Sequence, residues 1–444
     1  MKNKKFGIIL FIILFSYFLI IMDNSIIFTG TVKIASELNL NEAALSWVSN
    51  AYTITFGGFL LLAGRLGDFL GRKKIFLAGL IIFGLSSLAI GLSQSATQII
   101  IFRAIQGIGS AIIAPTSLAL LMDSYQDSMR MKAISYYGAT AGIGASVGLI
   151  LGGWLTSTIS WRAGFLINVP FAIFLAILIL FKITDKTKQE ALKIDFVGAI
   201  FSVAFALLFV YGITISNLLL IGLSILILIA FVIWEGHQLH PIMPLSLFAN
   251  RIRTGAYITR FTFMMAMLTY WFIVPQILQN HYGFTPLQAG MGFLPLTIVN
   301  FVGALYLPRL TVKFGNSHII LIGQCILLVG MILSAIIDPR NGYWLTIGLP
   351  MVFVGLGQGW LLAPLTSAGV EDVSPELAGA ASGMTNTVHQ IGGPVGLSIV
   401  VLFSSNLIGN WIAYYHLVMW FIVGFNTLGL VTLILTNLER KKTI

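Results

Sequence analysis

The chain has 444 residues, of which 57% are hydrophobic and only 9% are charged, with a formal net charge of +10. Soluble domains carry about 25% charged residues, so this composition excludes a soluble protein and indicates one that is surrounded by lipid. The positive charge does not imply a nucleic-acid partner, because the basic residues lie in short connections between apolar segments. The single cysteine, Cys325, excludes a disulfide framework and a cysteine-based metal site, and we expect no metal and no other cofactor.

Apolar segments long enough to cross a bilayer recur along the whole chain. A membrane-spanning helix needs about 20 apolar residues, and the sequence contains fourteen such segments. In chain order they are residues 6–29, 45–64, 75–93, 98–121, 133–156, 162–182, 195–213, 217–236, 254–278, 289–309, 318–337, 343–366, 379–406 and 413–437. The predicted fold class is therefore an all-α, polytopic membrane protein with fourteen transmembrane helices.

The basic residues indicate how these helices are oriented. All but five of the 25 lysines and arginines fall at the chain ends or at alternate connections; the exceptions are Lys33, Arg103, Arg162, Arg260 and Arg340. Basic residues accumulate on the cytoplasmic side of membrane proteins. The pattern therefore predicts a multi-pass protein of the plasma membrane with both termini in the cytoplasm. Merging the pair at 195–213 and 217–236 would place a group of basic loops on the wrong side.

The two halves of the chain repeat one pattern. GRLGDFLGRKK (64–74) connects the second and third predicted helices, and PRLTVKFGNSH (308–318) follows 244 residues later in the same register. Arg65 thereby corresponds to Arg309. Such repeated halves are typical of transporters. The resulting division is a six-helix bundle at 1–184, a linker with an inserted helix pair at 185–253, and a second six-helix bundle at 254–444.

Six motifs taken together resemble those of the major facilitator superfamily, and within it the fourteen-helix drug:proton antiporters. In chain order they are MDNSI (22–26), the charged loop at 64–74, Arg103–Gly109, the glycine-rich Gly138–Gly153, WRAGFLINVP (161–170) and DFVG (195–198). The resemblance covers essentially the whole chain and departs at Ala145 and Leu149, where the family carries prolines. It implies the major facilitator fold and a monomeric multidrug efflux pump of the kind that gives antibiotic resistance.

Asp23 is the one carboxylate that lies clearly within a predicted span. It stands about six residues, or ~9 Å, from the outer end of its helix, and Arg103 lies at nearly the same depth in the fourth helix. Charges inside a membrane are costly and usually functional, so the two indicate an ion pair or a shared water-filled cavity. We expect Asp23 to take up an external proton and to release Arg103. The alternative is a fixed ion pair that only joins the two helices.

The charged loop after the second helix predicts another functional feature. Asp68 stands among Arg65, Arg72 and Lys73, and we interpret this group as a conformational latch whose ion pairs form in one facing state and break in the other. The alternative is that the basic residues only set the orientation of the chain, which leaves the aspartate unexplained. Val312 replaces the aspartate in the second copy, so coupling is expected in the first half.

Substrate contacts are expected on the walls of a cavity between the bundles, because aromatic rings and methionines give adaptable apolar contact and rings attract organic cations. The candidates are Trp47, Asn50, Tyr52, Phe56, Gln106, Tyr136, Tyr137, Met264, Tyr270, Trp271, Asn386, His389 and Gln390. Alternatives remain open for several of them. Trp47 fits an interfacial aromatic belt, and the three polar residues near 389 fit hydrogen bonds between helices. Arg260 either extends to the interface or faces the cavity.

These features predict a proton-coupled antiporter that exports amphipathic, often cationic, drug-like compounds by alternating access. Its partners would be small-molecule substrates, protons and the lipid bilayer. The alternative within the same fold is a proton-coupled transporter of narrow specificity for an endogenous metabolite. The sequence has no GxxxxGK[ST] loop, so we do not expect direct use of ATP. It also lacks a clustered catalytic constellation, so we do not expect an enzyme.

Overall fold

The structure, a computed structural model, describes residues 6–183, 195–239, 241–374, 377–407 and 409–437. Within these ranges fourteen helical segments are long and apolar enough to cross a membrane. This confirms the predicted number of spans and the all-helical fold class. The backbone at Arg65 and Asp68 is helical, but their side chains lie outside the described part of the structure.

The helices of the first half are α1 (Ile8–Leu38), α2 (Glu42–Leu70), α3 (Arg72–Gly91), α4 (Ala96–Ser124), α5 (Asp127–Thr158), α6 (Trp161–Leu166) and α7 (Asn168–Lys182). The inserted pair is α8 (Phe196–Thr214) and α9 (Leu218–His237). The second half contains α10 (Arg251–Asn280), α11 (Pro286–Met291), α12 (Leu294–Phe314), α13 (Asn316–Ile336), α14 (Leu349–Gly369), α15 (Ala378–Ser404) and α16 (Trp411–Asn437). α6 and α7 together form one span, as do α11 and α12.

Two spans are interrupted where the sequence contains proline. α7 begins two residues before Pro170, and α12 begins one residue before Pro295. Proline lacks the N–H that continues a helix and clashes with the preceding turn, so a new helix starts readily next to it. Hydropathy alone predicts one continuous helix in each place, because the residues on both sides of the break are apolar.

The two charged connections have the same backbone turn. α2 ends at Leu70 and α12 ends at Phe314, and a glycine with left-handed φ follows each helix. The φ angle is 98° at Gly71 and 79° at Gly315. Glycine adopts such angles without the strain that a Cβ atom would cause. The repeat in the sequence therefore corresponds to a repeated turn in the structure.

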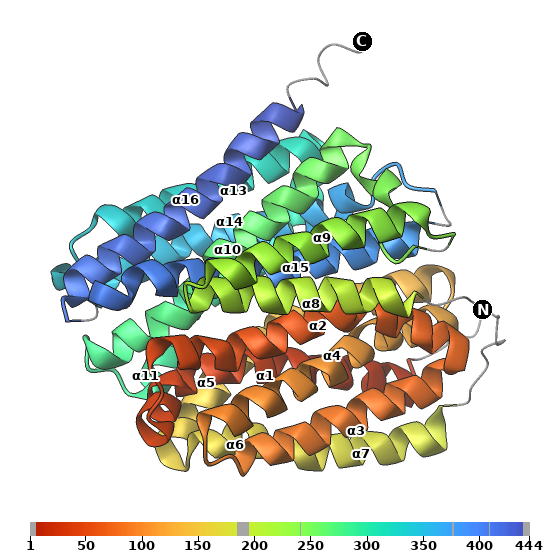
Figure 1. Cartoon of the computed structure of the whole chain (residues 1–444), viewed down its shortest axis with the longest axis horizontal. Coiled ribbons are helices and arrows are strands. Elements are labelled where there is room, and N and C mark those ends of the chain that lie inside the picture. Colours follow the sequence, from red (N-terminus) through yellow and green to blue (C-terminus); the bar gives the residue numbers. More distant parts are fainter. Residues whose placement is uncertain (1–5, 184–194, 240, 375–376, 408, 438–444) are drawn as a thin grey trace.

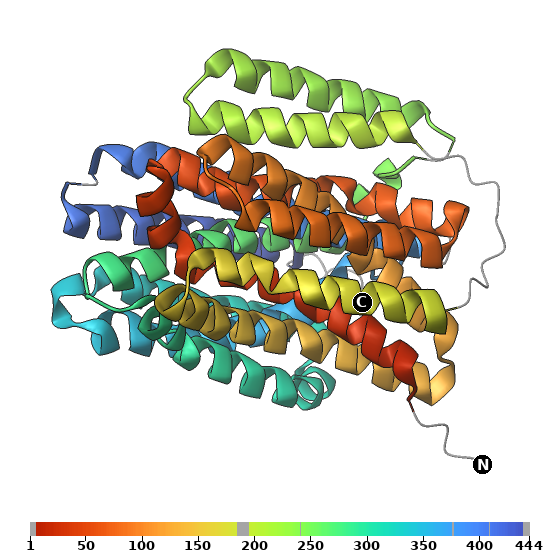
Figure 2. The ribbon, with the colours of Figure 1, turned by 90° about the horizontal axis from the view of Figure 1, so that it is seen from below.

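Helices from the two halves meet along one seam. Figure 1 shows α1–α7 on one side of the molecule and α10, α13, α14, α15 and α16 on the other, while α11 reaches across to α5. α2 contacts α15, and α1 contacts α10, so the seam runs between these helices. α8 packs against both α2 and α15 while α9 packs on α8, which places the pair on the outer flank of the bundle (Figure 2). The domain boundaries at 184 and 254 remain predictions.

The halves are in close contact at one end of the seam. We call the end that contains Arg72 and Lys313 the basic end, and the other the opposite end. At the opposite end, the backbone N–H of Leu287 in α11 donates to Oγ of Ser157 in α5 over 3.0 Å. A methyl group at Gly153 would lie 2.5 Å from the backbone of α11. In addition to this hydrogen bond, the backbones of α5 and α11 therefore lie in direct contact at this end.

The glycine-rich part of α5 packs directly on α1. A methyl group at Gly148 would lie 2.5 Å from the carbonyl oxygen of Met22, and one at Gly152 would lie 2.7 Å from the carbonyl oxygen of Ile26. Small residues are what allow helices to approach this closely in membranes. The packing persists without the prolines of the resembling family, and it holds the segment of α1 that carries Asp23.

Candidate functional site: a cavity and a buried ion pair

A cavity of about 890 Å³ lies between the two halves. Its walls come mainly from α1, α2, α4 and α5 on one side and from α10, α12, α14 and α15 on the other. Phe28, Trp271 and Phe293 line its deep part, and Arg72 and Asp123 line it at the basic end. Small-molecule sites typically measure about 300–1,000 Å³. The cavity therefore has the size of a ligand site that extends to the basic end.

Seven of the thirteen substrate residues predicted from the sequence line this cavity. They are Phe56, Tyr137, Met264, Trp271, Asn386, His389 and Gln390. They come from four helices in both halves, and the structure brings them to one site. Their contact with a substrate remains a proposal.

The other six predicted residues lie outside the lining: Trp47, Asn50, Tyr52, Gln106, Tyr136 and Tyr270. Asn50 donates its amide to Oγ of Ser398 over 3.0 Å and so joins α2 to α15. Tyr270 is 1% exposed and packs edge-on against Phe293. These side chains face neighbouring helices, and in this facing state we do not propose them as substrate contacts.

Of these six residues, Trp47 and Tyr136 lie at the outer parts of the bundle. Tyr52 and Gln106 belong to a separate polar network around Asp23. The ring of Trp47 meets the ring of Tyr211 in the inserted pair, with centroids 5.6 Å apart. Tyr136 is 48% exposed. Tyr52 and Gln106 are fully buried around Asp23. Residue type alone did not distinguish these positions, because the rotation of a helix decides which face its side chains occupy.

Several cavity residues were missed by the sequence analysis. Tyr17 stacks on Tyr137 with ring centroids 3.9 Å apart, and Asn24 and Gln358 present polar groups to the cavity. The lining residues Tyr17, Asn24 and Phe28 stand at helical spacing on α1, which is the signal that would have found them. No group of three metal-ligating side chains occurs among the described residues.

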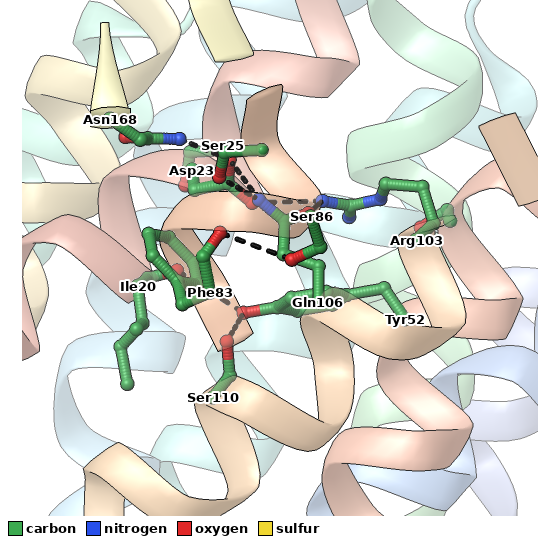
Figure 3. A network of polar contacts seen from close by, with 12 residues as sticks. Ile20, Asp23, Ser25, Tyr52, Phe83, Ser86, Arg103, Gln106, Ser110 and Asn168 are labelled. Carbon is green, nitrogen blue, oxygen red and sulfur yellow. Dashed lines mark hydrogen bonds and ion pairs between the residues drawn. The ribbon is translucent and has the colours of Figure 1, made fainter. Parts of the chain in front are cut away.

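Asp23 and Arg103 form a direct ion pair inside the first half. Nη1 of Arg103 lies 2.8 Å from Oδ2 of Asp23, and both side chains are 0% exposed. The amides of Gln106 and Asn168 donate to Oδ1 of Asp23 over 3.0 and 2.6 Å. Figure 3 shows these side chains converging on the carboxylate. Of the two arrangements expected from the sequence, the structure has the ion pair.

Further contacts surround the arginine. Its Nε donates to the carbonyl of Val48 over 3.1 Å, and its guanidinium carbon lies 4.1 Å from the ring centroid of Tyr52. The hydroxyl of Tyr52 donates in turn to Ser110 (Figure 3). Breaking a buried ion pair by removing one partner costs about 3–5 kcal/mol, because the other charge is left uncompensated. The state of Asp23 therefore affects how α1, α2 and α4 pack.

The ion pair lies behind the cavity wall. Asp23 and Arg103 do not belong to the lining, whereas Asn24 and Ser25, the next residues of α1, do. A change in the position of α1 at Asp23 would therefore change the wall directly.

The predicted latch is only partly described. Nη1 of Arg72 lies 2.5 Å from Oδ2 of Asp123 and also donates to the carbonyl of Ala119 over 3.0 Å. Lys73 donates to the carbonyl of Leu180 over 2.9 Å. The side chains of Arg65 and Asp68 lie outside the described residues. The sequence analysis missed Asp123, the carboxylate of α4 that pairs with Arg72 in this state.

Residues 13–397 match the Major Facilitator Superfamily, and the chain belongs to this family of membrane transporters. It is 32% identical over 391 residues to "Uncharacterized MFS-type transporter EfpA" of Mycobacterium tuberculosis, covering 85% of this chain and 73% of that protein. It is also 32% identical over 402 residues to "Cephamycin export protein CmcT" of Amycolatopsis lactamdurans, covering 87% of this chain and 82% of that one.

The fold agrees with this membership. The crystal structure of a D-xylose-proton symporter superposes with a TM-score of 0.71 at 14% identity, covering 97% of this chain and 96% of that chain. At so low an identity the likeness concerns the fold alone. The protein is thus a multi-pass membrane transporter and not an enzyme, and its relatives include exporters of antibiotics.

Proposed function

We propose that the protein is a proton-coupled antiporter that exports amphipathic compounds by alternating access. The observation that carries the proposal is the fully buried ion pair of Asp23 and Arg103 directly behind a cavity of ligand size. Ionisable groups inside membrane proteins commonly form proton relays. The relatives that export antibiotics support the export direction. From the distribution of basic residues we also propose that both termini and the basic end face the cytoplasm. From the resemblance to the family we propose that the protein acts as a monomer.

Protonation of Asp23 would weaken the contacts that position α1. The neutral carboxyl no longer attracts Arg103, while Val48 and Gln106 still accept hydrogen bonds from the guanidinium. A proton bound in one facing state and released in the other shifts the equilibrium between them by its difference in binding free energy. Because α1 also forms the cavity wall through Asn24, cargo and proton would bind in alternate states.

The pair of Arg72 and Asp123 would report which state is occupied. It joins the start of α3 to the end of α4 and lines the cavity at the basic end. The 46% exposure of the Asp123 side chain means that water screens this ion pair, so its strength is about 0–1 kcal/mol. A contact of this size suits a latch that breaks in every transport cycle.

The driving force is sufficient for one proton per cycle. A membrane potential of 100 mV supplies about 2.3 kcal/mol for each charge moved, which corresponds to a concentration ratio of roughly 50. Asp23 is the one buried carboxylate among the described side chains of the first half, which fits a low proton stoichiometry.

Purified protein in liposomes with an imposed pH gradient tests the proposal. Fluorescent amphipathic compounds of positive, zero and negative charge serve as cargo, and wild type is compared with Asp23→Asn. We expect gradient-driven flux of at least one compound in wild type and its loss in Asp23→Asn, with binding retained. Equal flux in both proteins would exclude Asp23 from coupling. Asp338→Asn is the matched control, because Asp338 also pairs with an arginine, Arg340, but outside the spans.

A further inference from the structure

The charged side chains of the cavity do not balance. The described lining residues that can carry charge are Tyr17, Arg72, Asp123, Tyr137, Arg260 and His389. Arg72 and Asp123 neutralise each other at the basic end. Arg260 then remains as the cation of the wall, and no carboxylate among the described residues pairs with it. A buried charge without a counter-ion is costly, so this position needs an explanation.

Arg260 is held in place but only partly satisfied. It is 7% exposed, and its Nη1 donates to the carbonyl of Leu362 over 3.2 Å and to Oγ1 of Thr366 over 2.6 Å. Its Nε is buried without a partner, and Nη2 has no hydrogen bond to any described residue. Nε and Nη2 form one edge of the guanidinium, the edge whose parallel N–H groups bind a carboxylate or phosphate in bidentate fashion.

Other polar atoms of the same cavity are also unsatisfied. Nδ1 of His389, Oε1 of Gln358 and Oδ1 of Asn24 are buried without hydrogen-bond partners, and all three residues line the cavity. His389 and Tyr17 both interact electrostatically with Arg260. Buried polar atoms are normally bonded. The two amide oxygens accept hydrogen bonds, whereas the imidazole presents an N–H to an anion in the tautomer that protonates Nδ1. The cavity therefore holds buried polar atoms that a bound ligand would satisfy.

The deep part of the wall carries large apolar side chains. Met264, Trp271 and Phe293 line the deep part of the cavity, and each provides large, adaptable contact area. A ligand that pairs with Arg260 and also packs on this apolar wall has an anionic head and a bulky apolar body. The aromatic rings alone suggest cations, as the sequence analysis expected, but a cation near Arg260 would be repelled.

We propose that the cargo class is amphipathic organic anions, whose oxyanion group binds the Nε and Nη2 edge of Arg260 while the apolar body packs near Trp271. This inference rests on the proposed function, since it concerns the cargo site of the same transporter. The oxyanion belongs to a carboxylate or to a phosphate head group, because the guanidinium edge accepts both.

Equilibrium binding of a matched probe series tests the proposal. The probes are 1-pyrenebutyrate, its methyl ester and 1-pyrenebutylamine, which share one apolar body and differ in head-group charge. Binding to the purified full chain is measured without a proton gradient, so the result does not depend on proton coupling. Wild type is compared with Arg260→Gln, Arg260→Lys and Arg309→Gln, the last removing an exposed arginine that does not line the cavity.

We expect wild type to bind the carboxylate about 10- to 100-fold more tightly than the ester, the factor that a hydrogen bond to a charged group supplies. Arg260→Gln should remove this preference, Arg260→Lys should keep part of it, and Arg309→Gln should leave it unchanged. Competition by lysophosphatidylglycerol would identify a lipid phosphate as an accepted head group, and its absence a soluble carboxylate. Equal binding of acid and ester, tighter binding of the amine, or an unchanged preference in Arg260→Gln would overturn the proposal.

Discussion

The two halves of this transporter bury positive charge in opposite ways. In the first half Arg103 is neutralised by Asp23, and neither side chain lines the cavity. In the second half Arg260 lines the cavity and bonds only to a carbonyl and a hydroxyl among the described residues. A pair sealed behind the wall suits a response to protons, whereas a partly satisfied cation in the wall suits a ligand. We therefore propose that proton coupling lies in the first half and that recognition of the cargo's charged head group lies in the second.

The two charged connections, at 64–74 and 308–318, also differ between the halves. Arg72 at the start of α3 reaches the carbonyl of Ala119 in α4 and pairs with Asp123. The corresponding residue of the second half, Asn316 at the start of α13, donates to the carbonyl of Pro364 in α14 over 3.1 Å. The contact from one helix start to a neighbouring carbonyl is thus kept in both halves. Only the first half adds an ion pair to it.

The largest effect on stability is expected when the buried arginine of each half is replaced in turn. Arg103→Met should lower the free energy of unfolding by about 3–5 kcal/mol, because Asp23 is left buried without its counter-ion. Arg260→Met should cost far less, because the arginine that it replaces has no ion pair to lose. Unfolding in mixed micelles measures both values. Equal losses in the two variants would show that Arg260 is as well paired as Arg103 and would remove the distinction between the halves.

Two glycines at matching positions test whether the helices of the two halves pack equally closely. Gly148 packs on the backbone of Met22 in α1, and Gly396 packs on Met265 in α10; each is the glycine of a matching VGL run, at 147–149 and 395–397. Alanine at either position should destabilise the fold by about 1–3 kcal/mol through overpacking. Gly222→Ala is the control, because no atom within 4 Å would meet the new methyl group. A loss at only one of the two positions would show that the repeat does not extend to this packing.

A smaller effect is expected at the basic end. Arg72→Gln should slow transport by up to about fivefold, which corresponds to ~1 kcal/mol, because the latch loses an ion pair that is partly exposed. Asn316→Ala should have less effect, since it removes only a hydrogen bond to a carbonyl. Initial rates in liposomes measure both. Exchanging the charges, with Arg72→Asp and Asp123→Arg together, should restore part of the rate, and failure to do so would argue against a latch at this pair.

The smallest effect concerns pH at the opposite end. Hydrogen bonds from Arg340 hold the pKa of Asp338 down at about 2, below its usual range. The pair's contribution to stability is therefore present above the unfolded pKa of about 3.9 and is lost only as pH falls through the folded value. Asp338→Asn should leave the dependence of transport on pH between about 5 and 8 unchanged. A shifted profile in this variant would show that the exposed pair takes part in coupling.

The spans and the ion pair could be predicted from sequence because each is determined by a large free energy, that of moving apolar segments or charged groups from water into lipid. Apolar segments of sufficient length must enter lipid, and Asp23 and Arg103 at matched depth reduce the cost of burial by pairing. Neutral side chains carry no such penalty. Tyr52 and Gln106 therefore suited a cargo site as well as a buried network, and Gln358 gave no signal. The orientation of Arg260 depends on how α10 is rotated, which neither depth nor hydropathy determines.

Proton release on cargo binding tests most directly whether Asp23 in the first half couples protons to cargo that binds at Arg260 in the second half. Purified protein in weakly buffered solution is mixed with 1-pyrenebutyrate, and the change in pH is recorded for wild type, Asp23→Asn and Arg260→Gln. We predict release of protons in wild type, binding without release in Asp23→Asn, and about 10- to 100-fold weaker binding in Arg260→Gln, with correspondingly less release at the same probe concentration. Undiminished release from Asp23→Asn would contradict the assignment of coupling to the first half.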